Sequence, residues 1–186
     1  MATRQAIEMR GFTLIELLVV LAIAALLLTL VAPSFSGYIA RKRLEGVFTE
    51  LTTDIQYARS EAVQRNAPVR ITFGTGCYAV HTVGSTATTC TQAGGTSLGM
   101  GAVAIKSFQL DSGSALSISP NNSLTFMQFD SIRGMATWNG TVPTSGSVDV
   151  TSSAGAWQLR ASMTPVGRAQ ICSPNGSVTG YQAISC

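Results

Sequence analysis

The sequence is poor in charge and nearly lacks histidine. Only 11% of its 186 residues are charged, and the formal net charge of +3 is no strong basic signature. The one histidine is His81, and Asp111, Asp130 and Asp149 are scattered near expected turns, so no paired carboxylates or metal-ligand spacing are found. We therefore expect no enzyme, no cofactor and no metal site. The later part of the chain is rich in Ser, Thr and Gly, which suits an exported β-rich domain better than a cytosolic enzyme.

One short segment formally resembles a hydrolase motif. Residues 95–99 match the Gly-x-Ser-x-Gly nucleophile elbow, which requires an apolar strand before it and a helix after it. The preceding Thr91-Gln92-Ala93-Gly94 is no such strand, and we expect a loop over residues 94–99. We expect His81 in a strand, at the surface or partly buried.

Near the start of the chain lies a long apolar run. Residues 12–32 contain one charge, Glu16, and a helix of that length spans about 31 Å, the thickness of a bilayer's hydrocarbon core. Arg4 and Arg10 precede the run and supply the positive-inside signal. The small residue Gly11 lies before the run rather than after it, so a cut at Gly11 would leave the apolar helix in the product.

There are four cysteines, and all of them follow the apolar run. They include no Cys-x-x-Cys pair, which argues against zinc. An even number in an exported chain makes disulfides the default, with three possible connectivities. We favour Cys77–Cys90 and Cys172–Cys186, because each closes a short loop and contributes roughly 3 kcal/mol in the chain-entropy model.

A second helical pattern follows the run, over residues 34–66. Its apolar residues fall three and four apart and form one stripe: Leu44, Val47, Leu51, Ile55, Ala58 and Ala62, widened by Phe48. Asn66 is a suitable C-terminal stop, and Pro68 cannot continue the helix. We expect this amphipathic half to lay its stripe on a globular domain.

Beyond Pro68 the apolar period changes to two. The predicted strands are 69–73, 78–83, 102–110, 116–119, 124–129, 147–151, 157–162 and 168–172. Their spacing fits antiparallel sheets. The expected core residues are Val103, Ile105, Phe108, Leu110, Leu124, Phe126 and Phe129, and we expect Trp138 and Trp157 to be core or half-buried.

Residues 11–17, Gly-Phe-Thr-Leu-Ile-Glu-Leu, resemble the class III leader of type IV pilins and type II secretion pseudopilins. The resemblance implies cleavage after Gly11 by prepilin peptidase, N-methylation of Phe12 and a role for Glu16 in assembly. A carboxylate in a bilayer costs about 2.5–3.5 kcal/mol, so it should have a partner. In this family the partner is the charged N-terminus of the neighbouring subunit. The alternative is an ordinary signal anchor with an incidental Glu16.

Residues 57–69 are similar to the helix end and first strand of the H-type (GspH-like) pseudopilins and the FimT/FimU minor pilins. The resemblance implies an α+β type IV pilin fold, in which a long N-terminal helix, half membrane and half amphipathic, packs on an antiparallel β domain. The implied divisions are a cleaved leader (1–11), a helix (12–66, transmembrane over 12–32) and a β-rich domain (67–186). A proline at Pro33 is typical of this family, and we expect it to kink the helix rather than end it.

Residues 164–186 resemble the C-terminus of FimT-type minor pilins linked to natural transformation, in which a Gly-Arg-x-Arg element binds DNA. Gly167 and Arg168 match, but the second arginine is Gln170. Arg160 could compensate if its strand pairs with that of Arg168 in a hairpin turning near Thr164. Arg133, Lys106 and Arg70 are further candidate cations. The alternative is that all of these are ordinary surface charges.

These resemblances imply a minor type IV pilin that primes or caps pilus assembly, with an added role in DNA uptake. The alternative is an H-type minor pseudopilin of a type II secretion system. The implied partners are other major and minor pilins or pseudopilins, prepilin peptidase, the inner membrane and DNA. The implied location is the inner membrane, crossed once, with the C-terminal domain in the periplasm before incorporation into a pilus or pseudopilus.

Overall fold

A computed structural model describes residues 11–121, 123–141 and 146–183, and only the backbone of residues 30–34. One helix precedes a series of strands: α1 (Leu14–Gln64), β1 (Val69–Gly74), β2 (Cys77–Thr82), β3 (Thr89–Thr91), β4 (Gly95–Ser97), β5 (Ala104–Gln109), β6 (Leu116–Pro120), β7 (Phe126–Phe129), β8 (Ala136–Trp138), β9 (Ser147–Ser152), β10 (Trp157–Met163) and β11 (Ala169–Cys172). By its internal contacts the chain divides into two units, Met1–Tyr38 and Ile39–Cys186. The division falls within α1.

The part of α1 in the first unit contains an unbroken apolar run over residues 17–28. Helix α1 continues through Pro33, so the prediction that this proline does not end the helix is confirmed. Over the part of the chain that the structure describes, no helix is both long and apolar enough to cross a membrane.

The part of α1 in the second unit buries the predicted stripe. The side chains of Leu44, Phe48, Leu51, Ile55, Ala58 and Ala62 are buried in the core, and Val47 packs partly against it. The helix ends as predicted at Asn66, whose φ of 49° is left-handed. The N–H of Asn66 donates to the Val63 carbonyl and that of Ala67 to the Ala62 carbonyl, each at 3.2 Å, which is the hydrogen-bond pattern of a Schellman motif.

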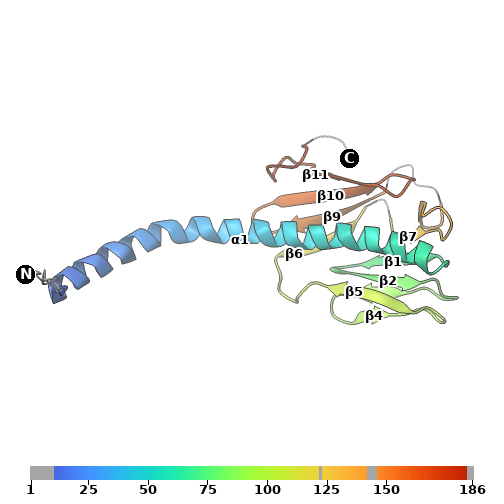
Figure 1. Ribbon diagram of the computed structural model, residues 1–186, viewed down its shortest axis with the longest axis horizontal. Helices are drawn as coiled ribbons and strands as arrows, with labels where there is room; N and C mark the ends of the chain where they lie inside the picture. Colours follow the sequence, from blue (N-terminus) through green and yellow to red (C-terminus); the bar gives the residue numbers. More distant parts are fainter. Residues whose placement is uncertain (1–10, 122, 142–145, 184–186) are drawn as a thin grey trace, which may run out of the picture. The chain divides into compact units, whose positions relative to one another are not determined.

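Two antiparallel sheets carry the rest of the core. The five-stranded sheet has the order β5-β2-β1-β7-β8, and the four-stranded sheet has the order β11-β10-β9-β6. The second half of α1 runs across both sheets, with β9, β10 and β11 on one side of it and β1, β2 and β5 on the other (Figure 1). This is the α+β arrangement that the sequence predicted.

Strand β5 is an edge of the five-stranded sheet, which corrects one predicted core residue. Val103, just before this strand, is 58% exposed, because none of the described strands pairs with β5 on its outer side. Ile105, Phe108 and Phe126 are only partly buried. Leu110, Leu124 and Phe129 are buried as expected, as is Trp138, while Trp157 is half-buried.

The predicted loop at residues 94–99 is wrong in part. Gly95–Ser97 form β4, which pairs with β3 in a small two-stranded sheet. The hairpin is tied to the main sheet by the Cys77–Cys90 disulfide, the pair that the loop-length argument favours. No helix follows Ser97, and the geometry of a nucleophile elbow is therefore absent from these described residues.

His81 is fully buried, which corrects the expected surface position. Its Nδ1–H donates to the Thr82 carbonyl at 2.7 Å, and its Nε2 lies 2.9 Å from the Thr72 hydroxyl, which donates to it in that tautomer. The segment after β2 covers the ring with Thr88. Burial, and to a lesser extent the charge of Arg70, lowers the pKa of His81 although its bond to Thr82 opposes this.

A buried polar cluster joins α1 to the five-stranded sheet. The Tyr78 hydroxyl donates to Asp54 at 2.8 Å, and Lys106 donates to Asp54 at 2.8 Å and to Glu50 at 3.1 Å. Burial, with the Asp54 carboxylate next, raises the pKa of Tyr78, and it stays a neutral donor. Lys106, one of the candidate DNA-binding cations, is therefore engaged in holding the helix to the sheet.

Candidate functional sites at the two ends of the chain

The first candidate site is the start of α1. The Thr13 hydroxyl accepts the backbone N–H of Glu16 at 3.3 Å, so Thr13 is the N-cap and Glu16 the third helical residue. The carboxylate of Glu16 is exposed, and among the described residues it has no ion pair and no hydrogen bond. An acidic side chain in the first turn also interacts favourably with the helix dipole. Phe12, beside the predicted cut at Gly11, is 81% exposed.

Beyond Glu16 the apolar side chains of α1 are exposed where the structure describes them in the first unit. Large side chains on every face of the helix are more than half exposed: Leu17, Leu18, Val19, Val20, Leu21, Ile23, Leu26, Leu27 and Leu28. A helix that is apolar all round is normally covered, either by other protein or by lipid. The N-terminal site is therefore an apolar surface that the described residues of the first unit leave exposed.

The second candidate site lies on the hairpin of β10 and β11. The two strands pair antiparallel with Arg160 opposite Cys172 and Ser162 opposite Gln170, and the turn runs from Thr164 to Arg168. Alternation along the strands puts Arg160, Gln170 and Arg168 on one face. Arg160 and Arg168 lie about 13 Å apart along the hairpin, because Thr164, which lies opposite Arg168, is four residue steps from Arg160.

Arg160 does not present an uncompensated charge on that face. Its Nε and Nη2 donate to the two carboxylate oxygens of Asp149, each at 2.7 Å. Burial would raise the pKa of Asp149, but hydrogen bonds from Arg160, Asn121 and Gln158 outweigh it and leave this pKa lowered. The hydrogen bond to Asp149 in turn raises the pKa of Arg160. Asp149 therefore neutralises Arg160, the arginine that was expected to compensate for the uncharged Gln170.

Gly167 is required by the fold as well as by the motif. Its φ is 77°, and a Cβ there would lie 2.9 Å from the Gly134 carbonyl oxygen and 3.2 Å from Nε of Arg59. The Gly167 carbonyl oxygen also accepts a 3.4 Å hydrogen bond from Gln56 of α1. The glycine thus lets the turn lie directly against the helix, and it leaves the neighbouring Arg168 exposed.

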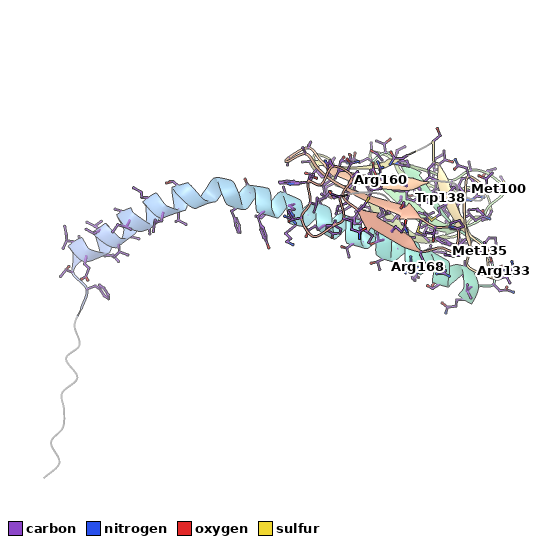
Figure 2. The ribbon with its side chains drawn as sticks, turned by 90° about the horizontal axis from the view of Figure 1, so that it is seen from above. Met100, Arg133, Met135, Trp138, Arg160 and Arg168 are labelled. Carbon is purple, nitrogen blue, oxygen red and sulfur yellow. A yellow bond between two sulfur atoms is a disulfide. The ribbon has the colours of Figure 1, made fainter. Side chains whose placement is uncertain are left out.

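The two remaining candidate cations, Arg70 and Arg133, have different surroundings in the structure. Arg70 stacks 3.9 Å from the centre of the Phe126 ring and donates to Gln128, and by strand alternation it is on the sheet face away from α1. Arg133 is exposed on the turn after Asp130. Figure 2 shows Arg133 toward the end of the second unit, with Arg168 and then Arg160 farther from that end.

Sequence reasoning missed Arg59. It lies on α1, and its Nε would be 2.9 Å from a Cβ at Gly134 and 3.2 Å from one at Gly167. No spacing within the sequence relates residue 59 to residues 134 and 167. Only the packing of the two turns on the helix brings these three segments together.

The second predicted disulfide falls partly outside the described residues. Cys172, at the end of β11, is disulfide-bonded. Cys186, its predicted partner, lies outside the described residues, and this pairing stays a prediction. Among the residues that the structure describes, no cluster of three His, Cys, Asp or Glu side chains could hold a metal ion.

Comparisons with known proteins agree with this anatomy. Residues 48–167 match the family model described as type II transport protein GspH, and residues 9–32 match the prokaryotic N-terminal methylation motif. No curated protein matches the chain.

The fold is similar to two crystal structures of the type IV minor pilin FimU from Pseudomonas aeruginosa (strain PAO1). The form in space group P21 has a TM-score of 0.53 and 16% identity, over 77% of this chain and 97% of that chain. The form in space group P65 has a TM-score of 0.50 and 16% identity, over 75% and 99% of the two chains. The predicted type IV pilin fold is confirmed by this likeness.

Proposed function

This chain belongs to the GspH family of type II transport proteins, and we propose that it is a minor type IV pilin, a structural subunit that primes or caps pilus assembly. The observation that carries the proposal is the apolar half of α1, exposed on every face in the single chain. Such a helix suits two environments in turn: the membrane before assembly and a bundle of neighbouring helices after it. We place residues 12–32 in the inner membrane, crossed once, and residues 67–186 in the periplasm.

The same proposal assigns roles to three residues at the start of the chain. Prepilin peptidase cuts residues 1–11 away after Gly11 and methylates the new N-terminus at Phe12. Glu16 then pairs with the charged N-terminus of a neighbouring pilin. The methylation motif over residues 9–32 supports the first role. The second is supported by the carboxylate of Glu16, which has no partner among the described residues.

Intact-mass spectrometry tests the processing step. Co-expression of the full chain with a prepilin peptidase should yield a product that begins at Phe12 and carries one methyl group. The chain expressed alone should keep residues 1–11. A cut after the apolar run, removing residues 12–32, would contradict the proposal and leave an ordinary secretory signal.

A minor pseudopilin of a type II secretion system is the second candidate. The family match favours it, since the GspH description is that of a type II transport protein, whereas the fold likeness is to pilus subunits. Fractionation separates the two. A pilus subunit appears in sheared surface filaments, whereas a pseudopilin stays with the cells and its deletion blocks secretion of an exoprotein.

We further propose that the turn at Gly167 and Arg168 takes part in DNA uptake. Arg168 is exposed and is the main contact; Arg160, whose charge Asp149 compensates, contributes less, and Gln170 lacks a charge. Arg168→Gln should weaken binding of duplex DNA, and Gln170→Arg should strengthen it, because the new guanidinium lies on the same face. Unchanged affinity in both variants would remove DNA from the proposal and leave the assembly role intact.

A further inference from the structure

Three arginines lie on segments of the second unit that are distant in the sequence but pack against one another. Arg59 lies on α1, Arg133 on the turn before β8, and Arg168 on the turn between β10 and β11. Arg133 directly precedes Gly134 and Arg168 directly follows Gly167, the two glycines against which Arg59 packs. The Cα atoms of Arg133 and Arg168 are therefore each about 3.8 Å from the Cα atom of the neighbouring glycine.

The two turns are held in this arrangement by the backbone. A Cβ at Gly167 would lie 2.9 Å from the Gly134 carbonyl oxygen, so the turns touch. The N–H of Ala136 donates to the Pro165 carbonyl at 3.2 Å and joins them. Both glycines have positive φ, 61° at Gly134 and 77° at Gly167, and substituted residues there would push the turns away from Arg59.

The guanidinium groups of these arginines have no protein partner among the described residues. No ion pair and no side-chain hydrogen bond engages Arg59, Arg133 or Arg168, whereas Arg41, Arg65 and Arg160 each pair with a carboxylate. Arg59 is half-buried, and a cation removed from water normally has a compensating anion.

Asp130 is an acidic group close to Arg133 in the sequence, and its carboxylate is already hydrogen-bonded. The Asp130 carboxylate accepts four backbone N–H groups, those of Ile132, Arg133, Gly134 and Met135, at 2.6 to 3.2 Å. These bonds, led by the one from Arg133, lower the pKa of Asp130 and fix the turn. Asp130 therefore shapes the loop that presents Arg133, and the cluster keeps an excess of positive charge.

We propose that Arg59, Arg133 and Arg168 form one phosphate-binding surface that binds the backbone of duplex DNA. Arg59 and Arg133 supply, from other segments, the charge that Gln170 does not. This inference rests on the proposed DNA contact at Arg168. It adds Arg59, which no sequence pattern indicates, and it selects Arg133 from the further candidate cations. The surface reads phosphates, so it binds without sequence preference.

The number of phosphate contacts sets the salt dependence of binding. Each neutralised phosphate contributes about −0.9 to the slope of log affinity against log salt, so three contacts give a slope of about −2.7. Raising the salt from roughly 50 to 200 mM should then weaken binding about 40-fold, and about 12-fold for a chain with two contacts.

The experiment titrates the full chain, in neutral detergent, into a labelled duplex across that salt range. Arg59→Gln, Arg133→Gln and Arg168→Gln should each reduce the steepness of the slope by about 0.9. Arg43→Gln is the matched control. Arg43 is an exposed arginine of α1, also without an ion pair among the described residues, and about 24 Å along the helix from Arg59. It removes the same charge and should leave the slope unchanged.

Each remaining outcome has a distinct meaning. If Arg168→Gln flattens the slope but Arg59→Gln and Arg133→Gln match the control, the three-arginine surface is wrong and the contact at Arg168 stands. If the unaltered chain does not bind duplex even at low salt, both fail. If Arg43→Gln flattened the slope equally, binding would depend on net charge alone, and the proposed surface would be wrong. Arg133 is exposed on a turn, so its variant tests the surface even if Arg59→Gln does not fold, which circular dichroism would reveal.

Discussion

Arg160 and Asp149 form a bidentate ion pair across the neighbouring strands β10 and β9. Two hydrogen bonds of 2.7 Å join the guanidinium to both carboxylate oxygens, and the Asp149 side chain is only 7% exposed. The pair explains why an arginine on the face of the candidate site contributes mainly to the sheet and less to a binding surface.

Arg160→Gln should destabilise the fold by about 2–3 kcal/mol near neutral pH, because it leaves the buried carboxylate of Asp149 without its guanidinium. The double variant Arg160→Gln, Asp149→Asn should be destabilised less, since it also removes the unpaired carboxylate charge. Thermal unfolding followed by circular dichroism compares the two. Equal stability of the single variant and the unaltered chain would show that the pair is dispensable.

The pH dependence of this pair has a definite sign. The pKa of Asp149 is lowered in the folded chain, so its stabilising effect is complete above the ordinary aspartate pKa of about 3.9 and is lost as pH falls through the lower, folded value. The double variant should unfold less steeply with acid below about pH 4. Parallel acid titrations of the two proteins would contradict the assignment.

His81 should make the protein sensitive to milder acid. Its pKa is lowered by burial, so the unfolded chain binds more protons below about pH 6.5, and stability is complete above that value and declines as pH falls below it. His81→Gln removes the titrating group and keeps one donor and one acceptor. Its melting temperature should change less between pH 7.5 and 5 than that of the unaltered chain, and identical changes would refute the role of His81.

Gly167→Ala should lower the stability of the fold by more than the backbone strain of the substitution alone. The new methyl would meet the Gly134 carbonyl and Arg59, in addition to the roughly 1–2 kcal/mol of a left-handed conformation. Gly101→Ala is the control, because Gly101 has a φ of 79° and nothing within 4 Å of its Cβ position. Equal losses of stability in the two variants would show that the turn does not press on the helix.

The disulfides give a chemical prediction. Replacing Cys77 and Cys90 together by serine should lower stability by about 2–4 kcal/mol, with the β3–β4 hairpin affected first because the bond anchors it to β2. Peptide mapping without reduction should link Cys172 to Cys186. A peptide joining Cys172 to either of the other cysteines would contradict the predicted pairing.

Local patterns account for much of this fold. The stripe on α1 and its end at Asn66 depend on neighbours within a few residues, and both could be predicted. The β3–β4 hairpin could not, because it has little apolar alternation of its own and depends on the disulfide and on pairing with its partner strand. His81 was misplaced for a related reason, since the segment that buries it comes later in the chain.

The candidate sites divide in the same way. Glu16 follows from a contiguous motif, and the hairpin that carries Arg168 follows from two alternating segments around a turn. The pairing of Arg160 with Asp149 depends on strand register, which the sequence leaves open. The approach of Arg59 to Gly134 and Gly167 depends on how two turns pack on a helix, so no motif search would relate these positions.

The central claim is that this chain joins a filament through its N-terminal helix, and Glu16→Ala tests it most directly. The full chain and the variant are expressed with their own assembly machinery, with Glu50→Ala as a control that removes a carboxylate of α1 outside residues 12–32. We predict that all three proteins reach the membrane fraction in equal amounts, and that only Glu16→Ala is lost from purified filaments. Incorporation of Glu16→Ala at the level of the unaltered chain would contradict the account.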